Sequence, residues 1–255
     1  MTRAGVGDRA FALDAAVIGV VSVAICLAAS RLWLMTGVVT VVWIARLALW
    51  ARLPPSERGH PLTTELGFLL LCTVVGAFND WSSVTRHQIY SYTVPLDLPA
   101  LSGIPTWMLV YWGLILRFVT TLFSWRRLGL PAPRARGRAL RLGFLLAIVV
   151  ATRQLIYRTY GDPVWSWVPF AVALVLVLTL LFPGRKRALL MGVFLLGGPL
   201  VEIAYISIGG LHSYALGWFF GVPLWIVLWW PIAALVWDEV GYSLTRWSWR
   251  SSSSG

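Results

Sequence analysis

The sequence predicts an all-α, polytopic membrane protein: a helical bundle of about eight transmembrane helices, arranged as two parallel four-helix repeats. The chain has 255 residues, of which 58% are hydrophobic and only 12% charged. That charged fraction is about half of what a soluble domain carries. The apolar residues fall in runs of about 20, the length that crosses roughly 30 Å of hydrocarbon. An internal similarity between the two halves predicts the repeats.

Each predicted helix corresponds to one apolar run, and short polar segments separate the runs. In chain order the runs cover residues 11–30, 32–50, 64–80, 104–125, 141–160, 164–183, 187–208 and 221–240.

The repeat boundaries follow from the most basic segment of the chain. We expect the first four-helix repeat at residues 1–126 and the second at residues 141–250. A basic cytoplasmic linker at residues 127–140 joins them, and a low-complexity tail at residues 251–255 is expected to be disordered.

The positions of the arginines predict the orientation of the chain. The formal net charge is +11, and most of the basic residues lie in alternate polar segments, with the largest group at residues 126–141. The other side has only Arg31, Arg86, Arg153 and Arg158. By the positive-inside rule, both termini are cytoplasmic in an integral protein of a bacterial inner (plasma) membrane. The charge therefore indicates topology signals and contacts with anionic membrane lipids, and no nucleic-acid partner is expected.

The internal similarity is a matched series of residues. Asp80 and Glu202 each precede a Ser-Tyr pair whose tyrosine, Tyr92 or Tyr214, lies 12 positions later. A glycine stands four positions before each acid, and Gly-x-Pro-x-Trp-x-x-x-x-Trp follows each tyrosine. Self-similarity of this length indicates a duplicated unit. A unit of four helices begins and ends on one side, so the two copies are parallel.

Asp80 and Glu202 are the predicted catalytic residues. Carboxyl groups inside a membrane are costly and usually functional. In a two-fold arrangement the two acids face one cavity, where one acts as an acid and the other as a base. The alternative is that both lie at the interface and meet water or an arginine such as Arg86.

Aromatic and amide side chains near the two acids are the predicted substrate-binding residues. Indole faces stabilise cations without acting as nucleophiles, although aromatics at helical spacing also serve as packing. The set is Asn79, Tyr92, Trp107, Trp112, Tyr214, Trp225 and Trp230.

Three other charges inside predicted helices need an explanation. Arg46 lies close to the cytoplasmic end, where it can extend to the interface. Arg117 is deeper and needs a partner, for which Glu65, Asp238 and a lipid phosphate are the candidates. Arg153, with its neighbour Gln154, is placed to hold an anion beside Glu202.

From Glu202 to Trp230 the chain resembles the carotenoid biosynthesis protein family, which includes carotenoid hydratases. The residues that carry the resemblance are Glu202, Gly210, Tyr214, Gly221-Val222-Pro223 and Trp230. The match covers about 30 residues of each repeat. It implies acid-initiated addition of water to an isoprenoid double bond. A chemical analogy with small integral-membrane terpene cyclases implies cyclisation instead.

Three functions follow from these observations. The first is an enzyme of lyase or isomerase type that hydrates or cyclises an isoprenoid lipid, so that its partner is a hydrophobic, lipid-like substrate. The second is a transporter or flippase with a central acid pair. The third is a non-catalytic membrane assembly protein. No cofactor and no metal site are expected, because the chain has only three histidines and two cysteines and lacks nucleotide-binding motifs. The sequence does not specify the oligomeric state.

Overall fold

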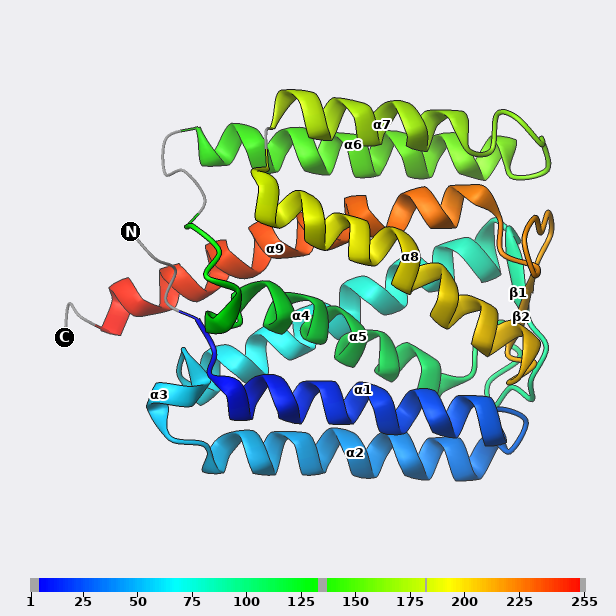
Figure 1. The fold of residues 1–255 in the computed structure, drawn as a ribbon. Helices are drawn as coiled ribbons and strands as arrows, with labels where there is room; N and C mark the ends of the chain where they lie inside the picture. The colour runs from blue at the N-terminus through cyan, green and yellow to red at the C-terminus, as the bar shows by residue number, and fades with distance from the viewer. Residues whose placement is uncertain (1–4, 133–136, 182, 253–255) are drawn as a thin grey trace.

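The computed structural model shows a bundle of long helices, and it confirms the predicted polytopic helical membrane fold (Figure 1). The structure describes residues 5–132, 137–181 and 183–252. Part of the predicted linker and residues 253–255 of the predicted tail lie outside these ranges. The last helix extends to Ser252 and therefore includes two of the five residues expected in the tail.

The first half of the chain forms four long helices and several short elements. In order they are α1 (Asp8–Ala28), α2 (Leu32–Arg52), the short α3 (Pro55–Arg58), α4 (Leu62–Trp81), the π-helix η1 (Ser82–Arg86), β1 (Tyr90–Tyr92), α5 (Thr106–Ser124) and the 3₁₀ turn η2 (Arg126–Leu128).

The second half repeats this order with fewer short elements. It contains α6 (Arg138–Thr159), α7 (Val168–Leu180), α8 (Arg185–Ser207), β2 (His212–Tyr214) and α9 (Leu224–Ser252). The prolines of the two matched Gly-x-Pro-x-Trp series directly precede helices, Pro105 before α5 and Pro223 before α9. A proline there costs no helical hydrogen bond.

Within the described residues, seven helices are long and apolar enough to cross a membrane. The sixth predicted span differs, since α7 has 13 residues and not the expected 20. At 1.5 Å per residue, it is about 20 Å long. It nevertheless runs back beside α6, so α1 begins and α9 ends at the same end of the bundle (Figure 1).

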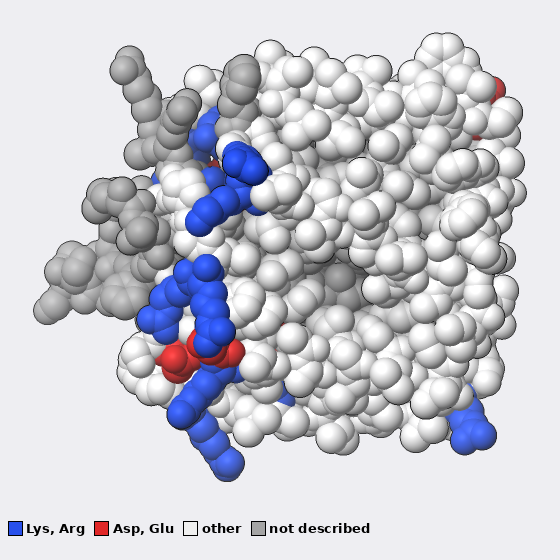
Figure 2. All heavy atoms as spheres, in the orientation of Figure 1, with Lys and Arg blue, Asp and Glu red and all other residues white. Residues whose placement is uncertain are grey.

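The two ends of the bundle differ in charge and structure. Lysine and arginine side chains gather at one end of the face drawn in Figure 2, where Arg126 and Arg127 lie beside Asp8 and Glu57. We call this the arginine end. The opposite end carries the small sheet of β1 and β2, and we call it the sheet end (Figure 1).

Close packing of one helix pair in each half uses the glycines that the sequence comparison matched. A Cβ atom added to Gly76 of α4 would lie 2.7 Å from Cβ of Trp112 in α5. A Cβ atom on Gly198 of α8 would collide with the ring of Trp230 in α9. Only glycine lets these tryptophans lie directly against the neighbouring backbone. The paired contacts support the proposed duplication, whose boundaries stay a prediction.

A cluster of buried charges lies toward the arginine end of the first half. Arg46 binds Asp14, with 2.8 Å from Nε to Oδ1, and also forms an ion pair with Glu65. Arg117 binds Glu65, with 2.8 Å from Nη2 to Oε2. Glu65 is thus the partner of Arg117, one of the three candidates from the sequence. The expectation for Arg46 is wrong: its side chain is 1% exposed because two carboxylates hold it inside the bundle.

Candidate functional site

The sheet end joins the two halves through the segments that follow the two acids. Strands β1 and β2 are antiparallel, with Tyr90 opposite Tyr214 and Tyr92 opposite His212. The π-helix η1 follows α4 shortly after Asp80, so the backbone there is wound more widely than in an α-helix. Such π-helical turns are frequent at functional sites. Because the strands pair, the residues that follow Asp80 and those that follow Glu202 form one cluster.

Each acid accepts hydrogen bonds from the strand of its own half. Asp80 accepts from Tyr90 and Tyr92, the latter with 2.8 Å from the phenolic oxygen to Oδ2. Glu202 accepts from Tyr214 at 3.4 Å, and its Oε2 lies 3.0 Å from Nε2 of His212. Asp80 is fully buried and Glu202 is 8% exposed. The two carboxyl groups therefore hold the sheet against α4 and α8.

The tyrosines of this cluster remain hydrogen-bond donors. Burial, with Asp80 and Glu202 nearby, raises the pKa of Tyr92 and of Tyr214 well above the usual value for a phenol. Both hydroxyl groups therefore stay protonated in the physiological range and donate to the carboxyl groups.

A cavity of about 600 Å³ lies between the two halves, next to this cluster. Its walls come from α1, α4, α5, α6, α8 and α9, and nearly all of the lining side chains are apolar or aromatic. It opens sideways between α5 and α8, where Figure 2 shows a hollow near the middle of the molecular face. A cavity with apolar walls, one polar end and a lateral opening suits a lipid-like molecule that enters from the bilayer.

The structure brings most of the predicted site residues together at this cavity. The lining residues among them are Asn79, Tyr92, Trp112, Glu202, Tyr214, Trp225 and Trp230.

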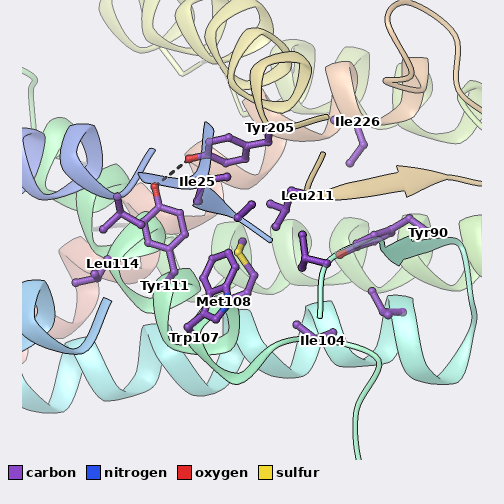
Figure 3. Packing of buried hydrophobic residues seen from close by; sticks show 14 of the residues in the cluster. Ile25, Tyr90, Ile104, Trp107, Met108, Tyr111, Leu114, Tyr205, Leu211 and Ile226 are labelled. Atoms are coloured by element: carbon purple, nitrogen blue, oxygen red, sulfur yellow. Dashed lines mark hydrogen bonds between the residues drawn. The ribbon is translucent and has the colours of Figure 1, made fainter. Parts of the chain in front are cut away.

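Two predicted residues lie outside the cavity wall. Asp80, one of the two expected catalytic acids, is bound by Tyr90 and Tyr92, which do line the cavity. Trp107 is packed in the hydrophobic core beside Ile104 and Met108, as Figure 3 shows. The first helix turn of α5 directs Trp107 into this core, whereas Trp112, five residues later, lies on a different side of the helix.

A hydroxyl cluster in the cavity wall has no counterpart among the predicted residues. Tyr205 of α8 and Tyr111 of α5 are 3.0 Å apart between their phenolic oxygens (Figure 3). Ser22 of α1 lies 2.7 Å from the Tyr205 oxygen and 3.2 Å from the Tyr111 oxygen. The cluster ties α1 to the second half. Each residue sits singly in an apolar run, so no local pattern indicates that they meet.

Arg153 of α6 lines the cavity and contacts the first half there. Its Nη2 donates to Oγ of Ser83, and its guanidinium lies 5.2 Å from the ring centre of Tyr157. Gln154, expected beside it, is exposed on the outside of the helix.

No residues of the described part of the chain form a metal site, since no group of three or more histidine, cysteine, aspartate or glutamate side chains is suitably placed.

The chain shares its fold with a mycobacterial Insig homolog. The crystal structure of that protein, MvINS from Mycobacterium vanbaalenii, is 24% identical to this chain, with a TM-score of 0.56. The match covers 72% of this chain and 94% of MvINS. A cross-linked MvINS trimer has the same identity and TM-score and is covered to 95%. No protein-family model and no curated protein matches the chain.

This likeness corrects two interpretations of the sequence. The solved structures that share the fold are Insig homologs, and no carotenoid hydratase or terpene cyclase is among them. Of the residues that carry the resemblance, Pro223 directly precedes α9 and Trp230 packs against Gly198 of α8. The hypothesis of an enzyme that hydrates or cyclises an isoprenoid lipid is overturned by the same finding. In the structure, the carboxyl groups expected to transfer protons accept hydrogen bonds from the protein's own tyrosines.

Proposed function

We propose that this chain is a non-catalytic membrane protein that binds a lipid-like ligand in its central cavity and acts on another membrane protein. The observation that carries the proposal is the cavity itself, which is apolar, open to the bilayer between α5 and α8, and polar only near the sheet end. The fold shared with an Insig homolog supports a regulatory or assembly role over turnover.

The contacts of the two acids support binding over catalysis. Asp80 is covered by Tyr90 and Tyr92 and does not reach the cavity surface. Glu202 does reach it, but His212 and Tyr214 already occupy its Oε2. A general acid needs its proton within hydrogen-bond reach of the substrate, and here the carboxyl groups serve as anchors for the sheet. The ligand meets tyrosine and tryptophan side chains.

The proposal includes the location and orientation of the chain. It places the protein in a bacterial plasma membrane with the arginine end in the cytoplasm, because basic residues concentrate there. In a variant without native cysteines, a single cysteine in place of exposed Arg127 should label from the cytoplasm. One in place of Trp218, which is 69% exposed, should label from the outside. Labelling of both positions from the same side would contradict this orientation.

Ligand binding is tested by filling the cavity from a position that tolerates a side chain. Gly197 of α8 lines the cavity, and a Cβ atom there meets nothing within 4 Å. The substitution Gly197→Phe should therefore occupy ligand space without disturbing the helix contacts. Protein purified in mild detergent should carry lipid detectable by native mass spectrometry, and Gly197→Phe should carry much less.

Gly192 provides the matched control. It lies in the same helix, has the same free space around its Cβ position and does not line the cavity. Gly192→Phe should retain the lipid of the wild type. Equal lipid in both variants would refute the cavity as the binding site. The lipid recovered after long incubation should be chemically unchanged, and a hydrated or cyclised product would contradict the non-catalytic role.

A further inference from the structure

Arg153 of α6 is a buried cation in the wall of the cavity. The residue is 6% exposed and lines the cavity near the sheet end. Its Nη2 donates to Oγ of Ser83 and lies 3.4 Å from the carbonyl oxygen of Asn79. The guanidinium also lies 5.8 Å from the ring centre of Trp229. These neutral groups fix the position of the guanidinium but do not balance its charge.

Arg153 has no carboxylate partner in the part of the chain that the structure describes. Among the described residues, no carboxylate oxygen lies within 4.0 Å of its guanidinium nitrogens. The nearby acids, Asp80 and Glu202, accept from the tyrosines of β1 and β2. Nε of Arg153 is buried and has no hydrogen-bond partner. A charge inside a membrane protein normally has a counter-charge or lines a functional site, and an unpaired buried cation is costly.

A second donor in the same wall also lacks an acceptor. Nε1 of Trp230 is buried without a partner, and Trp230 lines the cavity. The remaining wall toward the arginine end is apolar, with Phe118, Leu122 and Val236 among its residues. Nε of Arg153 and Nε1 of Trp230 are both hydrogen-bond donors, and Arg153 is also charged. A complementary ligand supplies acceptor oxygens and negative charge at its polar end.

We infer that Arg153 binds the anionic headgroup of a lipid, a carboxylate or a phosphate, whose hydrocarbon chain occupies the apolar part of the cavity. This inference rests on the proposed function and specifies the class of its ligand. Nε and the charge of Arg153 meet the anion, while Ser83 holds the other side of the guanidinium. Charge-assisted hydrogen bonds from arginine are among the strongest that a headgroup can make.

The test compares lipids that differ only in the charge of the polar end. Oleate is compared with oleyl alcohol, and dioleoyl phosphatidic acid with dioleoylglycerol, by quenching of tryptophan fluorescence in delipidated protein. One charge-assisted contact should make the anion of each pair bind about tenfold more tightly or better. The oleate and phosphatidic acid arms distinguish a carboxylate from a phosphate. Inorganic phosphate alone should not compete, and competition at equal concentration would overturn the assignment to a lipid.

Variants then connect the preference to this residue. Arg153→Gln should bring the anion and its neutral analogue to similar affinity, whereas Arg153→Lys should keep part of the difference. Arg158→Gln is the control, because Arg158 is exposed on the same helix, and it should behave as the wild type. If Arg153→Gln unfolds, the comparison of anionic and neutral lipids on the wild-type protein still tests whether the cavity prefers an anion.

The outcomes separate this inference from the proposed function. If the anion and its neutral analogue bind the wild type equally well in both pairs, the inference about the anion fails and the lipid cavity stands. If neither pair binds at all, the proposed function fails as well.

Discussion

Replacing Glu65 by glutamine tests the buried charge cluster, because Glu65 supplies half of its negative charge. Arg46 and Arg117 face Asp14 and Glu65, and none of the four residues is more than 3% exposed. Glu65 also lies 2.5 Å from Nε2 of His60. The glutamine keeps the volume of the side chain but leaves the two guanidinium groups sharing the single carboxylate of Asp14.

The expected loss is large because the cluster is buried. Removing one partner of a buried ion pair costs about 3–5 kcal/mol, against a total stability of about 5–15 kcal/mol for a typical domain. The free energy of unfolding is measured in mixed micelles of mild detergent and sodium dodecyl sulfate, with circular dichroism as the signal. Asp8→Asn is the control, because the Asp8–Arg127 pair at 2.5 Å is exposed on both sides. It should cost far less than Glu65→Gln, because solvent screens an exposed ion pair.

A second variant separates lost charge balance from lost contacts. Glu65→Gln combined with Arg46→Gln restores one cation to one anion. It should be more stable than the sum of the single losses suggests, since residues of one network are coupled. If Glu65→Gln lowers the free energy of unfolding no more than Asp8→Asn does, or if the double variant is simply additive, the reasoning about buried charge is refuted.

Two further predictions concern helix packing and pH. Gly198→Ala should destabilise the protein by about 1–3 kcal/mol by overpacking against Trp230, whereas neighbouring Gly197→Ala, with free space, should stabilise it by up to about 1 kcal/mol. Equal effects in the same unfolding assay would contradict the close contact. Hydrogen bonds from the start of α5, including Thr106 N–H at 3.0 Å, hold the Asp97 pKa below its usual value. Asp97 therefore stabilises the fold above about pH 4, and that stability is lost as the pH falls through the lower folded-state pKa. In Asp97→Ala this part of the pH dependence of the melting temperature should disappear, and an unchanged profile would exclude Asp97 as its source.

Most of the fold was predictable because lipid imposes a simple length rule on helices. The sixth span shows where the rule fails. Residues 164–167 extend the apolar run, but Asp162 accepts hydrogen bonds from the N–H groups of Val164 and Trp165 at 2.8 and 2.7 Å. This turn delays the helix start to Val168. An aspartate followed by proline is a recognisable turn signal, so the later start of this helix could have been predicted from the sequence.

The site was predictable only where it follows a local pattern. The matched spacing from each acid to its tyrosine indicated which residues meet at the sheet end, and seven of the nine predicted residues line the cavity. The role of the acids stays a prediction, and the spacing did not show that each acid accepts a hydrogen bond from the tyrosine itself. The Ser22–Tyr205 contact joins positions 183 residues apart, and one sequence carries no signal for such a pair.

The two polar clusters differ in when they can form during synthesis and insertion of the chain. The charge cluster of Asp14, Arg46, Glu65 and Arg117 lies wholly within the first half, so these helices have the contacts they need to associate soon after insertion. The hydroxyl cluster of Ser22, Tyr111 and Tyr205 forms later, because Tyr205 is synthesised 94 residues after Tyr111. Domains generally fold in the order of synthesis. During that interval the part of the cavity wall that α1, α4 and α5 form lacks the helices of the second half that complete it.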